Sequence, residues 1–519
     1  MKPRPGAATS GSEALSGPLI GRERTNFGAL ASRPLATAHQ TCDFYATMSA
    51  QLPSQPASVF SRRRAALRRR LGDAPALVFA GNVHARNYPA NTFPFRADSH
   101  FLYLVGAAIP EGALLLHGER AELFVPPKDE DDPLWHGPTP GPEALAHATG
   151  VDAVRSGTEL SAAIAALGGG AVVATLPSAE PLTRVDQCRL LGRTWPADEA
   201  PGVARLDALD LALADAMIEL RLVHDDAALA MIRRAALGTT AAHLAGMAAT
   251  RPGLLEHDVR AAMEREFLAR GMTTAYSSIV TVHGEVLHNT TYDGRLGEHD
   301  LLLADVGGEL EGWANDVTRT WPVRGRFSPT QRALYDIVLQ ANLDGIAKVR
   351  PGVRYRDVHL ASCLTLARGL VDEGLLRGDP ESLVERGAHA IFFPHGVGHL
   401  LGLDVHDMED LGDRAGYAPG RSRSPQFGLG YLRLDRDLAP GMQVTIEPGL
   451  YLVPAILGRK ALVGPFIADG SFDPAAVARF ADVRGIRIED DVLCTTTDPE
   501  VLTAAIPKTA SAVESAVLE

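Results

Sequence analysis

Four carboxylic acids in the second half of the chain stand at the ends of short apolar segments. Asp305 closes the run LLLADVGG, and Asp316 opens the run NDVTRT a few residues later. A hairpin between these two segments would set both carboxylates side by side, where they repel each other strongly in an apolar setting. Either one of them carries a proton or a cation lies between them, and capping or salt-bridge roles stay open for the pair taken alone.

Two further segments repeat the arrangement. Glu447, in the run MQVTIEPG, precedes a Pro-Gly turn, and Glu489, in the run GIRIEDD, follows an alternating strand. Alternation puts Ile486 and Ile488 on one face of that strand and Arg487 and Glu489 on the other. Arginine can neutralise four strand-borne acids only in part, so the pattern favours additional cations.

Three histidines fall within twelve residues, in PHGVGH and LDVHD. His395 and His399 could share a helix face, but Pro394 and the glycines around them favour extended or turning backbone. A lone histidine is more often a satisfied core residue, whereas His395, His399 and His406 beside four strand-borne acids favour a metal centre. Oxygen-rich ligands with imidazole suit Mn²⁺, Co²⁺ or Zn²⁺, and a pair of such ions predicts hydrolysis.

These segments need elements to position them, and the first half of the chain predicts a separate α/β domain. A helix is expected from Ser58, with the arginines among residues 62–70 on a solvated face, because no aromatic side chains interleave with them as in a nucleic-acid site. A Pro- and Asp-rich stretch near residues 194–210 marks the domain boundary. Strands are expected at Ala76–Phe79, Phe101–Val105, Ala113–Leu116 and Ala121–Val125.

The second half predicts helices around residues 226–250 and 255–270, a helix pair within 328–375 and a strand-rich tail. No period of 20–50 residues repeats, which excludes solenoids and propellers. The domain organisation expected is therefore a disordered extension over 1–47, an N-terminal domain over 48–207 and a catalytic domain over 208–519.

Composition narrows the class of protein. The chain has 519 residues and a net charge of −13, so nucleic acid is a disfavoured partner. Its four cysteines are far apart and form no CxxC pair, which favours free thiols in a reducing compartment. No segment reads as a membrane span or a signal peptide, so we expect a cytoplasmic protein.

Taken as an ordered set, the runs DVGG, NDVTRT, HGVGHLLGLDVHD, TIEPGLY and GIRIEDD resemble the pita-bread metallopeptidases, specifically the aminopeptidase P and prolidase family. The resemblance covers about residues 210–505, and the first domain resembles the creatinase-like N-terminal domain of that family. It implies an α+β fold, in which a pita-bread catalytic domain follows a smaller α/β domain. The activity implied is that of a metallo-aminopeptidase acting on proline-containing peptides, in a homodimer or homotetramer.

Carried onto this sequence, the resemblance implies a ligand set for two Mn²⁺ ions, with Co²⁺ or Zn²⁺ as alternatives. Asp316 and Glu489 would bridge the ions, Asp305 would chelate one of them, and His399 and Glu447 would hold the other. A hydroxide bridging the ions would attack the carbonyl of an Xaa-Pro bond.

The resemblance also implies roles around the metals. His288 and His406 match positions that hydrogen-bond the substrate, and His395 matches an outer histidine of the pocket. Arg487 matches an arginine that supports the ligands from outside. Trp135 resembles an N-domain tryptophan that lines a neighbour's active site in oligomers, and it reads equally well as a surface-loop aromatic.

The chain departs from the shorter bacterial aminopeptidases P by long insertions at 408–438 and 453–484, which look more like those of prolidase. Arg433 lies where prolidases carry an arginine suited to a dipeptide's carboxylate, although a surface salt bridge explains it equally well. An Xaa-Pro aminopeptidase is the preferred interpretation, and an Xaa-Pro dipeptidase is the alternative. A metal-free pita-bread binding module is a remote third, because all five ligand residues are present.

Overall fold

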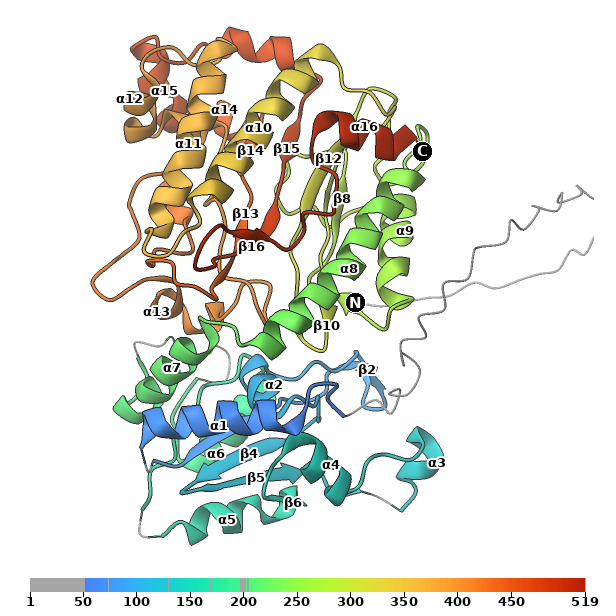
Figure 1. The fold of residues 1–519 in the computed structure, drawn as a ribbon, viewed down its shortest axis with the longest axis vertical. Coiled ribbons are helices and arrows are strands. Elements are labelled where there is room, and N and C mark those ends of the chain that lie inside the picture. The colour runs from blue at the N-terminus through green and yellow to red at the C-terminus, as the bar shows by residue number, and fades with distance from the viewer. Residues whose placement is uncertain are drawn as a thin grey trace, which may run out of the picture. The chain divides into compact units, whose positions relative to one another are not determined.

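A four-stranded sheet with helices on both faces forms the first domain of the computed structural model (Figure 1). The structure describes residues 52–518 apart from 73, 129, 169, 197–201 and 203–204, so the extension predicted over 1–47 lies outside the described residues. The sheet has the order β1-β4-β5-β6, with β6 parallel to β5 and the other neighbours antiparallel. Its strands are β1 (Ala76–Phe79), β4 (Ala113–His117), β5 (Arg120–Val125) and β6 (Ala153–Ser156).

Strand alternation distributes the core of this domain between the two faces of the sheet. Leu77, Leu115 and Phe124 point to one face and pack with α5 (Leu160–Ala166). The neighbouring strand residues point to the other face and join the core that includes Leu67 of α1 (Ala57–Leu71). The strands expected at 76–79, 113–116 and 121–125 and the helix expected from Ser58 are therefore confirmed. The remaining elements of the domain are β2 (Ala85–Tyr88), β3 (Asn91–Thr92), α3 (Asp132–His136), α4 (Pro142–Thr149) and α6 (Pro181–Leu191).

The strand expected at Phe101–Val105 is wrong, because these residues belong to helix α2 (Ser99–Val105). The Asp98 side chain caps the helix by accepting hydrogen bonds from the amides of His100 and Phe101, and Gly106 ends it in the left-handed conformation. Every residue of α2 is buried, so the segment has no polar face from which a helical period could be read.

The solvated arginine face expected on α1 is wrong for two of its members. Arg63 and Arg64 are buried, whereas Arg62, Arg69 and Arg70 are exposed. Arg63 forms a bidentate pair with Asp225, with both N···O distances at 2.9 Å, and Arg64 donates to the carbonyl of Leu104. These arginines tie α1 to neighbouring elements, a role that periodicity alone does not reveal.

Two helix pairs organise the second half of the chain (Figure 1). The pair α8 (Asp226–Ala249) and α9 (Glu256–Leu268) matches the helices expected around 226–250 and 255–270. The pair α10 (Pro329–Lys348) and α11 (Tyr355–Asp372) matches the pair expected within 328–375. They follow α7 (Ala208–Arg221), which starts where the second domain is expected to begin, while the boundary itself stays a prediction.

The central sheet β12-β9-β8 is covered on both faces, and this explains the unbroken apolar run before Asp305. Leu302 and Ala304 pack into the core of α8 and α9, whereas Leu301 and Leu303 pack into the core of α10 and α11. The strands here are β7 (Thr273–Thr274), β8 (Ile279–Thr281), β9 (Leu301–Asp305), β10 (Gly308–Leu310), β11 (Trp313–Ala314) and β12 (Thr318–Pro322). Antiparallel pairing of Asp305 with Thr318 confirms the expected hairpin, with β10 and β11 inserted at its tip.

The tail is strand-rich, as expected, and ends in a helix. It contains β13 (Gln443–Ile446), β14 (Gly449–Tyr451), β15 (Gly485–Arg487), β16 (Asp490–Leu493), β17 (Glu500–Val501) and α16 (Ala510–Leu518). Strand β13 pairs with β16, and β14 pairs with β15. The α-helices of the two insertions at 408–438 and 453–484 are short: α13 (Asp413–Gly416), α14 (Pro454–Leu457) and α15 (Lys460–Ala468). Another short helix, α12 (Pro380–Arg386), precedes the first insertion.

None of the described helices is long and apolar enough to cross a membrane. Cys188, Cys363 and Cys494 are free thiols, in agreement with their spacing, and Cys42 lies outside the described residues.

Candidate metal centre

The structure brings the five expected ligand residues together in two groups that share one member. Ligand atoms of Asp305, Asp316 and Glu489 lie within 4.8 Å of one another, and so do those of His399, Glu447 and Glu489. The distance from Nε2 of His399 to Oδ2 of Asp316 is 3.4 Å, which links the groups a second time. Residues separated by almost two hundred positions in the sequence thus converge on one buried cluster.

Two glycines allow this convergence. A Cβ atom on Gly307 would lie 1.8 Å from the carbonyl oxygen of Asn315, so only glycine lets the end of β9 approach the segment that carries Asp316. Gly398, with φ at +153°, would place a Cβ atom 2.2 Å from the carbonyl oxygen of Thr445. The runs DVGG and HGVGH therefore need glycine for close backbone approach beside the ligands.

Asp305 is held from two sides. Its Oδ1 accepts a hydrogen bond from the hydroxyl of Tyr276, and its Oδ2 accepts one from Nη2 of Arg487 at 2.6 Å. Arg487 also donates to the hydroxyls of Tyr451 and Thr318, and the Thr318 hydroxyl donates to Glu489 at 2.7 Å. The support expected of Arg487 is thus matched by its contacts. Tyr276, Tyr451 and Thr318 were missed because uncharged residues carry no metal-ligand pattern, although two of them stand inside the motifs.

The clustered carboxylates are buried and repel one another, and the neighbouring arginine and histidine do not compensate all of their negative charge. Burial and the neighbouring Asp316 raise the pKa of Asp305 to about 7, and burial raises the pKa of Glu447 to about 7. Burial and the carboxylates around it raise the pKa of Glu489 well above its usual range. Without further cations the cluster would hold protons at neutral pH, so the donor set fits divalent metal ions.

The hydrogen bonding of His399 also fits a metal ligand. Its Nδ1 donates to the carbonyl of Leu400 at 2.9 Å, which leaves Nε2 free to face the carboxylates. Burial alone would lower the pKa of His399, but the hydrogen bond and charge of Asp316 outweigh it and raise the pKa to about 9. The imidazole thus stands where a cation is favoured.

The other three histidines surround the cluster. The ring of His406 lies 4.1 Å from that of His399, centroid to centroid, and its Nδ1 lies 3.1 Å from Oε2 of Glu409. His395 lies 2.9 Å from the hydroxyl of Tyr451, and burial together with Arg487 lowers its pKa to about 3. His288 is exposed, and partial burial and the charge of Arg487 lower its pKa.

Arg433 and Trp135 occupy less central positions. Arg433 forms an ion pair with Glu409 at 2.5 Å, which agrees with the salt-bridge interpretation of this residue. Trp135 lies on α3 of the first domain with 74% of its surface exposed, separate from the buried ligands.

A charge network lies next to Glu489, and it was not evident from the sequence: Asp490 and Arg319 are fully buried, and Lys508 is partly buried. Asp490 accepts hydrogen bonds from Arg319 and Lys508, both at 2.7 Å, and from the Thr503 hydroxyl at 2.9 Å. Arg319 also donates to the backbone carbonyl of Glu489. These contacts fix β12, β16 and the C-terminal segment against one another, immediately next to the candidate ligand Glu489.

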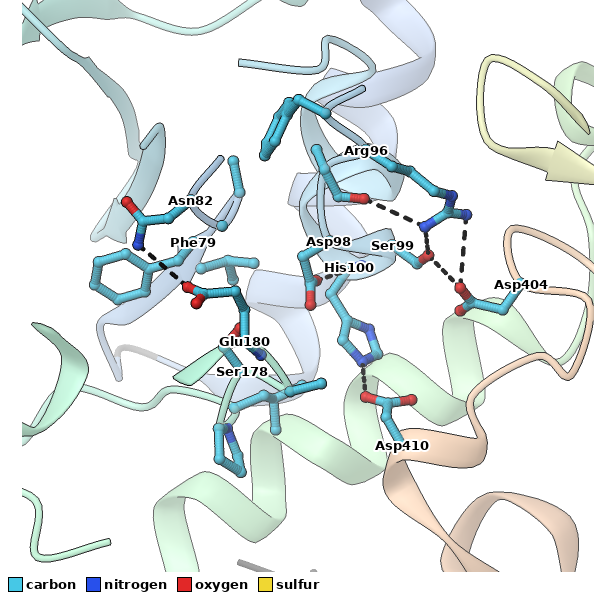
Figure 2. A pocket seen from close by; sticks show the side chains of 18 of the residues that line it. Phe79, Asn82, Arg96, Asp98, Ser99, His100, Ser178, Glu180, Asp404 and Asp410 are labelled. Carbon is cyan, nitrogen blue, oxygen red and sulfur yellow. Dashed lines mark hydrogen bonds and ion pairs between the residues drawn. The ribbon is translucent and has the colours of Figure 1, made fainter. Parts of the chain in front are cut away.

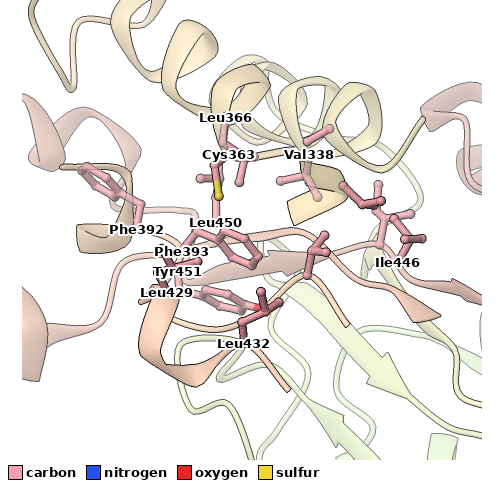
Figure 3. Close-up of a cluster of buried hydrophobic side chains, with 14 of the residues drawn as sticks. Val338, Cys363, Leu366, Phe392, Phe393, Leu429, Leu432, Ile446, Leu450 and Tyr451 are labelled. Carbon is pink, nitrogen blue, oxygen red and sulfur yellow. The ribbon is translucent and has the colours of Figure 1, made fainter. Parts of the chain in front are cut away.

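A second buried cluster, of His359, Cys363 and His389, resembles a metal site in composition only. The amide of Val397 donates to Nδ1 of His359, so Nε2 carries the proton and faces Sγ of Cys363 at 3.3 Å. Burial raises the pKa of the Cys363 thiol and lowers that of His359 to about 3, so both groups are neutral. Figure 3 shows Cys363 among apolar side chains such as Phe393, and we interpret the cluster as a neutral support for the backbone between His395 and His399.

A cavity of about 540 Å³ adjoins the centre at His406 and Glu409, and the first domain supplies its other wall (Figure 2). Its charged lining is mostly paired: Arg96 with Glu309 at 2.7 Å, and His100 with Asp410 at 3.0 Å. This cavity provides room for a ligand beside the carboxylate cluster.

Comparisons with known proteins agree with the fold and this site. The profile of Metallopeptidase family M24 matches residues 230–496, and that of the aminopeptidase P N-terminal domain matches residues 60–173. A probable Xaa-Pro aminopeptidase of Ajellomyces capsulatus is 32% identical over 480 residues, which cover 89% of this chain and 96% of that protein. The Xaa-Pro aminopeptidase of Haemophilus influenzae is 29% identical over 473 residues, covering 90% and 98%.

Solved structures extend the similarity to three dimensions. Aminopeptidase PepP of Pseudomonas aeruginosa superposes with a TM-score of 0.73 at 30% identity, and E. coli aminopeptidase P with the inhibitor Pro-Leu superposes with 0.72 at 29%. Each match covers 89% of this chain and 98% of the other. The fold and the acidic centre thus define a metallopeptidase of family M24, a hydrolase whose family binds divalent metal. Within it, the chain belongs to the aminopeptidase P family, and the expected pita-bread fold with its creatinase-like first domain is confirmed.

Proposed function

We propose that the chain is a dinuclear-metal exopeptidase that hydrolyses the Xaa-Pro bond at the N-terminus of peptides. The observation that carries this proposal is the pair of buried donor groups that share Glu489. The names of the relatives from Ajellomyces capsulatus and Haemophilus influenzae support the same substrate class.

In this proposal the two groups hold two Mn²⁺ ions, with Co²⁺ or Zn²⁺ as alternatives. Asp316 and Glu489 would serve both ions, Asp305 would complete one site, and His399 and Glu447 would complete the other. When bound, such a pair supplies Lewis acidity and makes water a competent nucleophile at neutral pH. Arg487 keeps Asp305 in place through its 2.6 Å contact while donating to Tyr451 on the opposite side.

The histidines around the centre bind and orient the substrate. Glu409 accepts from Nδ1 of His406, so Nε2 of that ring is free to hydrogen-bond a peptide group. The pKa values of His288 and His406 are both lowered by burial, so both rings are neutral at pH 7. A neutral ring accepts a hydrogen bond at one nitrogen and donates at the other, as substrate binding requires.

This arrangement suits proline at the second position of a peptide. The Xaa-Pro bond is a tertiary amide without an N–H group, so peptidases that need that donor fail on it. A centre that acts on the carbonyl needs no such donor, provided that a neutral histidine first takes the proton released by the attacking water and then passes it to the departing ring nitrogen.

An Xaa-Pro dipeptidase is the second candidate, and Arg433 is the residue that favours it. The test is hydrolysis of Gly-Pro and of Arg-Pro-Pro side by side with Mn²⁺ present. We expect cleavage of the tripeptide, and cleavage of the dipeptide alone would overturn the aminopeptidase in favour of the dipeptidase. The homodimer or homotetramer, with Trp135 at a neighbour's site, stays a prediction.

A further inference from the structure

Glu409 connects two residues of the site through its two carboxylate oxygens. Oε2 accepts from Nδ1 of His406 at 3.1 Å, and Oε1 accepts from Nη1 of Arg433 at 2.5 Å. Burial opposes the ionised form, but His406 and Arg433 outweigh it and lower the pKa of Glu409 to about 2. The side chain is therefore an anion throughout the neutral range.

This anion lies beside the ligand cluster. Glu409, Arg433 and His406 line a cavity of about 160 Å³ together with His399. The charge of Arg433 also reaches the histidines of the pocket, because it contributes to the lowered pKa of His288 and His395. Any charged group of a substrate that enters this cavity meets Glu409 and Arg433 together.

The length of the substrate decides whether a charged carboxylate or a neutral amide follows the proline ring in this cavity. In an Xaa-Pro dipeptide the proline bears a free carboxylate, one residue from the scissile bond, whereas a longer peptide bears a neutral amide there. Arg433 could pair with the carboxylate, but Glu409 already occupies that guanidinium. A carboxylate must therefore displace Glu409 or lie next to it with like charge, while an amide meets neither obstacle.

We propose that Glu409 is a specificity-determining residue that selects longer peptides against Xaa-Pro dipeptides, by neutralising Arg433 and repelling a substrate carboxylate. This inference rests on the proposed function. In this inference the salt bridge with Glu409 keeps Arg433 from binding the carboxylate of a dipeptide.

The test compares Gly-Pro with Gly-Pro-amide, two substrates that differ only in the charge at the position concerned. We expect the wild-type enzyme with Mn²⁺ to have a higher kcat/KM for the amide than for the acid. Glu409→Gln retains a carbonyl oxygen that can accept from His406 but removes the charge, so kcat/KM for the acid should rise about tenfold relative to the amide, or ~1.4 kcal/mol. Asp336→Asn, which removes an exposed partner of Arg332 on α10, is the matched control and should leave the ratio unchanged.

Two further measurements test whether the change in substrate preference depends on the charge of Arg433. Adding Arg433→Met to Glu409→Gln should remove the gain on the acid. In the wild-type enzyme, salt should narrow the difference between acid and amide, because the ion pair is partly exposed and its charges are screened. This salt measurement needs no variant and stands if Glu409→Gln fails to fold.

Three results would overturn the inference: equal wild-type kcat/KM for acid and amide, an unchanged ratio in a folded Glu409→Gln enzyme, or a ratio insensitive to salt. In each case cleavage of Arg-Pro-Pro would leave the proposed function standing. A wild-type enzyme that cleaves none of the three substrates would remove the proposed function and this inference with it.

Discussion

Removing the carboxylate of Asp490 tests whether the buried network behind the ligands stabilises the fold. Asp490 has no exposed surface, and it faces Arg319 and Lys508 at 2.7 Å each. In Asp490→Asn both cations lose their counter-charge while staying buried or half-buried. Breaking a buried ion pair from one side costs about 3–5 kcal/mol, and the remaining amide oxygen puts this variant near the lower value.

This loss of unfolding free energy can be converted into a shift of the thermal unfolding midpoint. The compact unit spans Ser49–Glu519, and an unfolding entropy of ~2.1 cal/mol/K per residue gives about 1 kcal/mol/K for it. We therefore expect the unfolding midpoint to fall by about 3 °C, as measured by calorimetry on the metal-loaded protein. Asp336→Asn, which breaks an exposed pair, should shift the midpoint by less than about 1 °C.

A double-mutant cycle makes the reasoning refutable. Arg319→Met alone leaves Asp490 with Lys508 as its remaining cation, and should destabilise the protein by a similar amount. Because both changes break one interaction, the double variant should lose less than the sum of the single losses. A shift below about 1 °C in Asp490→Asn would show that this carboxylate does not stabilise the fold, and strictly additive losses would show that Asp490 and Arg319 are not coupled.

The remaining predictions concern the metal centre and acid stability. Asp316→Ala should abolish hydrolysis and lower bound metal, measured by plasma mass spectrometry on the purified protein; full metal and activity would refute its bridging role. Dialysis against a chelator should lower the unfolding midpoint by about 5 °C, since each of two ions at 100 times its dissociation constant contributes about 2.7 kcal/mol, and Mn²⁺ should restore it. His243 is buried and neutral, and burial lowers its pKa to about 3. Its unfolded form gains a proton below about pH 6.5, so its contribution to stability should be lost as pH falls from about 6.5 to 3, by at most ~1.4 kcal/mol per pH unit. His243→Asn should make denaturant midpoints fall less steeply over that range, and an unchanged slope would contradict the assignment.

The clustering of the five candidate ligand residues could be predicted because these residues stand in short sequence runs of recognisable chemistry. Asp305 ends β9, and Asp316 lies in the connecting segment just before β12. The structure pairs Asp305 with Thr318, as the hairpin predicted from the sequence requires. Arg487 ends β15, and Glu489 follows two residues later, outside the strand. The alternation predicted from the sequence still separates both residues correctly from Ile486 and Ile488, which pack into the core. Short sequence runs of this kind can be interpreted without knowledge of distant contacts.

What the sequence did not reveal depends on distant partners. Asp490 and Asp491 look alike in the run GIRIEDD, yet Asp490 pairs with Arg319 and Lys508, whereas Asp491 accepts from the amides of Asn315 and Asp316. Helix α2 was predicted as a strand for a related reason: all of its residues are buried, so its sequence shows no helical alternation of apolar and polar residues. No local pattern carries such information, because it arises from contacts made after the chain has folded.

The position of Lys508 has a consequence for how the protein is made. Asp305 and Asp316 leave the ribosome roughly 190 residues ahead of Lys508, a delay of about 10–40 s at ~5–20 residues per second. During that interval Glu489, which lies between β15 and β16, and the segment that contacts Arg319 and Asp490 are still to be synthesised. The metal centre is therefore completed late in biosynthesis, so a nascent chain cannot act as a peptidase before its C-terminal segment has emerged.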